Sequence, residues 1–278
     1  VGLWEESIAS NRSSLEIQHD YYHAMDFVMY AHLQLAQDAK AKALIDDIYK
    51  IGRDELLNKE NIGTLGAYNA LAVIPARYAL ERGDWKAAAA LPAVPTKRAV
   101  ADSLLRFTRG LGMARSGDVA GAKREIEAIQ GAKRALEKAK DAYWAARSEE
   151  QLLAVSAWVA LAEGARDQAV KLMRAAADGE DGSIKSISME NRLYPMRELL
   201  GELLLETGQA APALREFEAA LKENPNRYRG LYGAGRAAQA AGDQKKAENY
   251  FAKLVKVAEK SDTDRPEIAQ AKMFLAKK

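Results

Sequence analysis

The chain has 278 residues, of which 48% are hydrophobic and 29% are charged, so it can bury a large core as an ordinary folded protein. Its 41 Lys and Arg residues nearly balance 39 Asp and Glu residues without a basic block, which argues against a nucleic-acid partner. The absence of cysteine excludes disulfides, thiolate metal sites and cysteine nucleophiles. No apolar run approaches the roughly 20 residues that span a bilayer, so we expect a soluble protein of the cytoplasm or the periplasm.

Along the chain, a small residue that is suited to a helix-ending turn recurs at regular intervals. A residue without a Cβ atom adopts the left-handed conformation that ends many helices, and an alanine follows most of these positions by five residues. Three of the six intervals between them are equal and the other three are longer, which predicts a series of helix pairs. The predicted turns lie at Gly2, Ala36, Gly83, Gly117, Gly164, Gly208 and Gly242.

The longer intervals predict insertions or lengthened helices at about residues 49 to 63, 131 to 145 and 178 to 193. The last of these stretches is polar and irregular, and we expect a loop there. In the third pair, Pro92 stands where a large apolar residue is expected, so its second helix should be short.

The sequence HDYYH, residues 19 to 23, is the strongest candidate for chemistry near the start of the chain. On a helix, His19 and His23 project from one face, and Asp26 lies three residues further along the same face. The motif is similar to the HExxH of zinc proteases, except that Asp20 stands in place of the glutamate. A metal site is therefore an alternative, and histidines that line a groove or form buried hydrogen bonds are the preferred interpretation.

Two adjacent aromatic residues, Tyr143 and Trp144, begin the long first helix of the fifth pair. Adjacent side chains point in different directions on a helix. We expect one ring to pack against the preceding helix pair, while the other reaches a groove on the surface of the protein.

The clearest repeats are residues 194–227 and 228–261. Four residue pairs recur at the same separation, namely Gly201 and Gly235, Gly208 and Gly242, Ala213 and Ala247, and Phe217 and Phe251. The small residues should permit close helix approach, and Phe217 should fill the space between neighbouring hairpins. After them, residues 265–277 should form a terminal capping helix, because stacked repeats need a final polar face.

This pattern resembles the tetratricopeptide repeat (TPR), in which small, large and proline positions recur with a period of about 34 residues. It departs from the family at Arg197, where a large apolar residue is usual. The resemblance implies an all-α, right-handed solenoid of antiparallel hairpins over residues 1–278, with six to seven units of which the first is incomplete. It also suggests the C-terminal part of a longer solenoid of bacterial type.

The resemblance further implies that the first helix of each repeat lines a concave groove where a partner binds. In the last repeat, Arg229 and Arg236 lie on one helix face with Tyr232 between them, which suits a carboxylate or phosphate as well as a solvated face. Carried onto this sequence, the groove positions are His23, Asp26, Tyr30, Arg77, Leu104, Phe107, Gln151, Trp158, Glu198, Glu202, Arg229, Tyr232 and Arg236.

Three functions follow from these observations. The preferred one is a non-catalytic scaffold that holds a protein, a peptide or a small ligand in the groove without a cofactor, since no catalytic motif is present. The alternatives are a metal-binding protein or metal-dependent enzyme that uses His19, His23 and Asp26, and a structural subunit of a larger assembly.

The first predicted helix, roughly residues 3 to 15, has no preceding helix to cover its apolar residues. Leu3, Trp4 and Ile8 should therefore form a sticky edge. We expect fraying or self-association through this edge.

Overall fold

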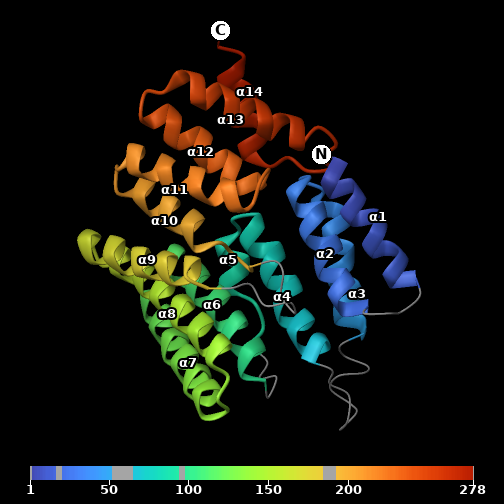
Figure 1. Cartoon of the computed structure of the whole chain (residues 1–278), viewed down its shortest axis with the longest axis vertical. Coiled ribbons are helices and arrows are strands. Elements are labelled where there is room, and N and C mark those ends of the chain that lie inside the picture. Colours follow the sequence, from blue (N-terminus) through green and yellow to red (C-terminus); the bar gives the residue numbers. More distant parts are fainter. Residues whose placement is uncertain (1, 17–20, 52–64, 94–97, 184–191, 278) are drawn as a thin grey trace. The chain divides into compact units, whose positions relative to one another are not determined.

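The computed structural model describes residues 2–16, 21–51, 65–93, 98–183 and 192–277, and every regular element in these ranges is a helix (Figure 1). The predicted all-α fold is confirmed. None of the described helices combines the length and the apolar character required to cross a membrane. The helices are α1 (Gly2–Glu16), α2 (Tyr21–Gln34), α3 (Asp38–Ile51), α4 (Leu65–Glu81), α5 (Trp85–Ala89), α6 (Ala99–Arg115), α7 (Val119–Lys138), α8 (Ala142–Ala162), α9 (Arg166–Asp181), α10 (Met196–Glu206), α11 (Ala210–Glu223), α12 (Tyr228–Ala240), α13 (Gln244–Val257) and α14 (Pro266–Leu275).

Six of the seven predicted turns have the expected backbone conformation. A positive φ, which favours a residue without Cβ, occurs at five glycines with values from 64° at Gly83 to 90° at Gly117. Ala36 adopts the same conformation with a φ of 53°. The seventh predicted position, Gly2, instead begins α1.

Aspartates that follow the turns start the second helices of several hairpins. The carboxylates of Asp84, Asp118 and Asp243 each accept a hydrogen bond from the backbone N–H three residues later, at 2.8 to 3.0 Å. Such a cap satisfies one of the N–H groups that a helix start leaves unpaired, and each contributes about 1 kcal/mol. The Gly-Asp pair therefore ends one helix and begins the next.

The chain divides into two compact units, which are described separately here. Unit 1 combines Val1–Asp47 with Leu200–Lys278, and unit 2 is Ile48–Leu199. One boundary falls within α3 and the other within α10. A single continuous solenoid over residues 1–278 stays a prediction from the repeat spacing.

In unit 1, phenylalanines fill the spaces that glycines leave between the helices of the regular repeats. The buried ring of Phe217 lies against Gly201 and Gly233, and a Cβ atom on Gly201 would stand only 2.8 Å from it. Phe251 lies in the same way against Gly235, where a Cβ atom would be 2.6 Å from the ring. The predicted role of Phe217 is thus confirmed, because any larger residue at these glycines would overlap the ring.

The N-terminal helices of unit 1 are joined to its C-terminal part by buried polar contacts. Arg265 holds Asp38 with a separation of 2.5 Å, and the two side chains are only 4% and 7% exposed. The carboxylate of Asp262 accepts hydrogen bonds from the first N–H groups of α3, at Ala39 (3.0 Å) and Lys40 (3.3 Å). A residue far along the chain therefore caps this helix.

This packing also covers part of the predicted apolar edge on α1. Trp4 meets the ring of Tyr30 edge-on at 5.4 Å, and Ile8 is half-buried. Leu3 is 73% exposed. Fraying or self-association through this edge therefore stays a prediction that concerns mainly Leu3.

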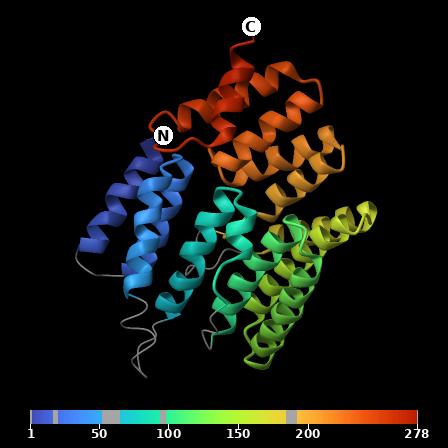
Figure 2. The same cartoon turned by 180° about the vertical axis from the view of Figure 1, so that it is seen from behind.

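In unit 2, the predicted extra residues mostly lengthen helices. The hairpins of α6 to α9 can be followed from both sides (Figures 1 and 2). Between residues 131 and 145, α7 continues to Lys138 and α8 begins at Ala142, while the predicted short second helix is confirmed as the five-residue α5.

The prediction of a loop from residue 178 is wrong for its first residues. Helix α9 continues to Asp181, because the Asp178 and Asp181 carboxylates bind Arg197 at 2.7 Å and Glu180 is buried. Residues 184–191 of this stretch and residues 52–63 of the first predicted insertion lie outside the described residues.

Candidate functional site

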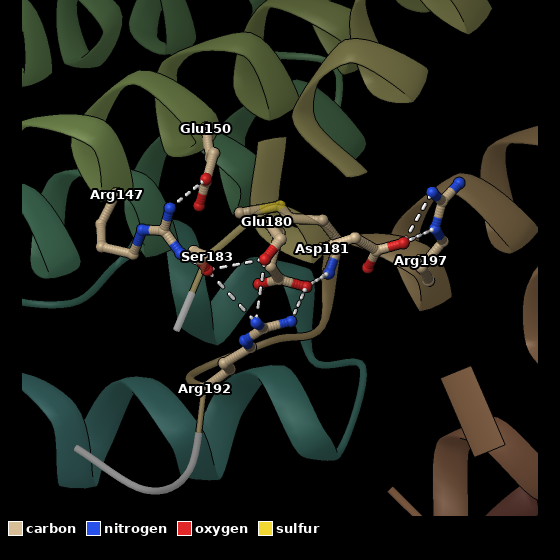
Figure 3. A network of polar contacts seen from close by, with 8 residues as sticks. Arg147, Glu150, Glu180, Asp181, Ser183, Arg192 and Arg197 are labelled. Carbon is tan, nitrogen blue, oxygen red and sulfur yellow. Dashed lines mark hydrogen bonds and ion pairs between the residues drawn. The ribbon is translucent and has the colours of Figure 1, made fainter. Parts of the chain in front are cut away.

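Unit 2 contains a small hollow that is open to solvent. It lies between α6, α8, the end of α9 and the segment that leads into α10, and Figure 3 shows its polar side. The lining combines aromatic, apolar and charged groups, as ligand sites commonly do. Its residues are Leu104, Phe107, Tyr143, Trp144, Arg147, Glu150, Gln151, Glu180, Arg192, Leu193, Tyr194 and Met196.

The apolar side of the hollow is a floor of buried residues with two aromatic rings beside it. Leu104 and Phe107 of α6 are 2% and 1% exposed and form part of the floor. The half-buried rings of Tyr143 and Trp144 at the start of α8 stand perpendicular, with centroids 5.3 Å apart. Both rings line the hollow, where such surfaces stack well against planar or apolar groups.

The polar side contains two buried carboxylates, each of which is paired with an arginine. Glu150 on α8 lies 2.5 Å from Arg147, one turn earlier on the same helix. Glu180, at the end of α9, lies 2.9 Å from Arg192 and accepts a hydrogen bond of 2.8 Å from the N–H of Met196. A buried charge needs such partners to offset its loss of hydration.

These carboxylates retain protons more strongly than exposed ones. Burial, together with the neighbouring charge of Glu180, raises the pKa of Glu150 to about 7, although Arg147 and Arg192 oppose the shift. Burial raises the pKa of Glu180 as well. Because the two acids interact, they titrate as a pair that holds a proton close to neutral pH.

The two arginines converge on one hydroxyl group. Ser183 Oγ accepts from Arg147 Nη1 and from Arg192 Nη2, the latter at 3.4 Å, and it donates to the Glu180 carbonyl at 2.6 Å (Figure 3). The Arg147 guanidinium lies 5.3 Å from the centre of the Tyr143 ring. Its Nε is buried and has no hydrogen-bond acceptor among the described residues.

Of the groove residues predicted in unit 2, three meet in this hollow. Leu104, Phe107 and Gln151 line it together. Arg77 is fully buried instead, and its Nη1 donates to the carbonyl of Arg192 at 3.2 Å, which holds the segment beside the hollow. Of the remaining residues predicted in this unit, Trp158 lies 3.8 Å from the Arg115 guanidinium and is 3% exposed, and Glu198 is fully buried.

The predicted arginine pair on α12, in unit 1, is only partly available. Arg229 binds Glu202 at 2.7 Å, and both side chains are largely buried. The Tyr232 hydroxyl hydrogen-bonds Gln270, while the exposed Arg236 lies 5.6 Å from the centre of the Tyr232 ring. Only Arg236 thus remains exposed on this face, and a ligand held by both arginines stays a prediction.

The predicted residues of α2 have different surroundings. Tyr30 is 5% exposed and accepts a hydrogen bond of 3.1 Å from Arg227, whereas Asp26 is half-buried. His19 lies outside the described residues, as does the side chain of His23. The residues that the structure does describe contain no group of three or more potential metal ligands, and the metal alternative stays a prediction.

The charged residues of the hollow were not predicted from the sequence. The sequence feature that could have indicated them is the pair Arg147 and Glu150, which lie three residues apart on a helix next to two aromatic residues. Glu180 was assigned to a loop, and its partner Arg192 follows a polar stretch without periodicity. Only the packing of α9 against α8 brings these two pairs together.

Comparison with known proteins supports the fold. The chain is similar to a crystal structure of a tetratricopeptide repeat protein from Parabacteroides merdae, with a TM-score of 0.51 and 11% identity. The similarity covers 99% of this chain and 100% of that one, so the all-α solenoid of TPR-like hairpins is shown. No protein-family model and no curated protein matches the chain.

Proposed function

We propose that this TPR-like solenoid is a non-catalytic scaffold that holds a protein, peptide or small ligand, and that the hollow of unit 2 is a place where the ligand is held. The fold supports a role in protein interaction in general, because stacked hairpins present extended surfaces. The observation that carries the proposal is the pair of half-buried rings, Tyr143 and Trp144, next to a buried charge network.

The composition of the hollow favours binding over catalysis. Glu150 and Glu180 are both engaged by arginines, and Glu180 also accepts a backbone N–H, so their positions are fixed by structural contacts. Aromatic rings that are already oriented lose little conformational entropy on binding and often dominate interfaces. The inner face of the first helices in the other repeats would extend the contact.

Site-specific photo-crosslinking tests this proposal in the full chain. A benzoylphenylalanine placed at Trp144 should form defined adducts in extracts of the cells that make the protein. The matched control places the same group at Gln130, an exposed position on α7.

Adducts that form at position 144, are absent at position 130 and disappear on Tyr143→Ala would support the proposed site. Identical adduct patterns at both positions would contradict it. A circular dichroism spectrum that is unchanged by each substitution confirms that the helices remain folded.

A further inference from the structure

We propose that the hollow of unit 2 recognises a carboxylate group, held by the guanidinium groups of Arg147 and Arg192, while the remainder of the ligand lies against Tyr143 and Trp144. This inference rests on the proposed binding function and names the chemistry of the ligand. The carboxylate belongs either to a small molecule or to an acidic side chain of a partner protein.

The geometry of Arg147 supplies the first argument. A guanidinium has five N–H donors in one plane, of which Arg147 uses Nη1 for Ser183 and Nη2 for Glu150. Its Nε is buried without an acceptor among the described residues, although an unsatisfied buried donor destabilises the folded state. A carboxylate oxygen from a ligand would satisfy this donor once the Arg147 side chain turns its Nε toward the hollow.

The convergence of two arginines supplies the second argument. Ser183 Oγ is a single acceptor that is shared by Arg147 Nη1 and, at a long 3.4 Å, by Arg192 Nη2, which also donates to the Glu180 carbonyl at 3.0 Å. A carboxylate has two oxygens and four lone pairs, so it serves two guanidinium groups better than one hydroxyl does. The side chain of Arg192 retains 22% exposure, which leaves it reachable from the mouth of the hollow.

The charge balance makes the binding depend on a proton. With both carboxylates ionised, Glu150 and Glu180 neutralise Arg147 and Arg192, and the cluster has no net charge to attract a further anion. When the pair of acids holds one proton, the cluster has a net charge of +1 and attracts an anion. Binding should therefore be accompanied by proton uptake at the pair.

The other described arginines near the cluster are each engaged by a carbonyl or a carboxylate oxygen. Arg77 of α4 donates to the carbonyl of Arg192, and Arg197 at the start of α10 is bound by Asp178 and Asp181. On α6, Arg106 and Arg109 are paired with Glu125 of α7. The groups that face the Glu150 carboxyl are thus Tyr143 and Arg147 of α8, Glu180 of α9, and Arg192.

The first experiment compares benzoate with benzamide, which has the same ring but no charge, by isothermal titration calorimetry on the full chain. Benzoate should bind at pH 6, and its affinity should fall by about tenfold for each pH unit above 7, since one proton is taken up per ligand. Titrations in two buffers with different ionisation enthalpies measure that proton directly. Equal affinities for benzoate and benzamide would overturn the proposal, as would a constant benzoate affinity between pH 6 and 8.5.

Two variants test whether Glu150 and Arg147 are responsible for benzoate binding and its pH dependence. Glu150→Gln makes the cluster permanently positive, so its affinity for benzoate should match the low-pH value and stay constant up to pH 8.5. Arg147→Lys keeps the charge but removes the Nε donor, and it should weaken benzoate binding by at least about tenfold. The control is Arg166→Lys on the exposed start of α9, which should leave the affinity unchanged.

Hydrogen exchange of α8 and α9 confirms that these variants are folded. If folded Arg147→Lys binds benzoate as tightly as the original chain, or if Arg166→Lys is equally impaired, the assignment is wrong.

A second pair of ligands distinguishes the two sources of the carboxylate. Acetyl-Trp-Glu-amide carries its only carboxylate on a side chain, and acetyl-Trp-Gln-amide is its neutral control. Tighter binding of the Glu peptide than of benzoate assigns an acidic protein segment, and the reverse order assigns a small molecule. If neither charged ligand is preferred to its neutral control while crosslinks at position 144 persist, the carboxylate inference fails but the scaffold function stands.

Discussion

The two units differ in how their helices pack against one another. In unit 1, repeats of equal length pack Phe217 and Phe251 against glycines, and the buried Asp38 pairs with Arg265. In unit 2, α7 and α8 are lengthened to 20 and 21 residues, and two carboxylates interact with each other as well as with arginines beside a hollow. The repeats of equal length in unit 1 are thus closely packed, whereas the polar site of unit 2 lies where the repeat is lengthened.

The largest loss of stability is expected at the buried ion pair that joins the N-terminal and C-terminal segments of unit 1. Arg265→Ala would leave Asp38 buried without its counter-charge, and breaking a buried pair in this way costs about 3 to 5 kcal/mol. Urea unfolding should show this loss, and hydrogen exchange should rise in α3 and α14. In the double variant Asp38→Ala/Arg265→Ala, the loss should be smaller than the sum of the single losses. Strict additivity would mean that the two side chains do not stabilise each other.

Glycines also distinguish the regular repeats from the lengthened part of α7. Gly233→Ala should destabilise unit 1 by about 1 to 3 kcal/mol, because the new methyl group overlaps the Phe217 ring. Its control is Gly131→Ala in the lengthened part of α7, where a Cβ atom meets nothing within 4 Å. That change should stabilise the helix by about 0.5 to 1 kcal/mol, and thermal unfolding of both variants checks the pair. A loss of stability at Gly131 would contradict the view that the lengthened part of α7 leaves room for a side chain at this position.

The stability of unit 2 should depend on pH through Glu150. Its pKa is about 7 in the folded chain and near 4.5 when unfolded, so between these values the folded state holds a proton that the unfolded state has lost. Stability is therefore highest below pH 4.5 for this group, falls as pH rises, and levels off above pH 7. The total loss should be about 3 kcal/mol.

Tryptophan fluorescence during urea unfolding at pH 5 to 8 measures this loss in unit 2, since Trp85, Trp144 and Trp158 lie there. Glu150→Gln should flatten the dependence. If the variant and the original chain show the same slope, another group is responsible.

The smallest effect is expected at an exposed pair that joins the same two segments of unit 1 as Asp38 and Arg265. Glu5 and Lys260 lie 2.7 Å apart, and their side chains are 42% and 65% exposed, so water screens their attraction. Glu5→Gln should leave the urea midpoint unchanged within error. A clear shift would show that exposed charges, and not only buried ones, hold α1 in place.

Much of the fold could be predicted because the relevant constraints are local. A turn residue with positive φ, a capping aspartate and a proline act within a few residues, so the turns from Ala36 to Gly242 and the short α5 follow from the sequence. The Phe217 packing was also predictable, since repeats of equal length return the same side chains to the same positions.

The site was predictable only in part. Leu104, Phe107 and Gln151 followed from their places in the repeat, but the end of α9 and the pairing of Glu180 with Arg192 did not. Arg77 and Glu198 were expected on an open groove, and the structure buries them. The repeat is interrupted between α9 and α10, and the position of a residue within a repeat, as for Glu198, does not state which neighbouring segment covers it.

The sequence by itself determined the helix pairs, their turns and the glycine–phenylalanine contacts, because each depends on backbone conformation or on a repeated interval. Only the tertiary structure decided that the first three helices belong with the last repeats and that two buried carboxylates interact beside two arginines. Asp38 and Arg265 are 227 residues apart, and Glu150 and Glu180 lie on different helices. Such contacts arise from the burial of whole helix faces, which fixes the neighbours of a charged group only after the chain has packed.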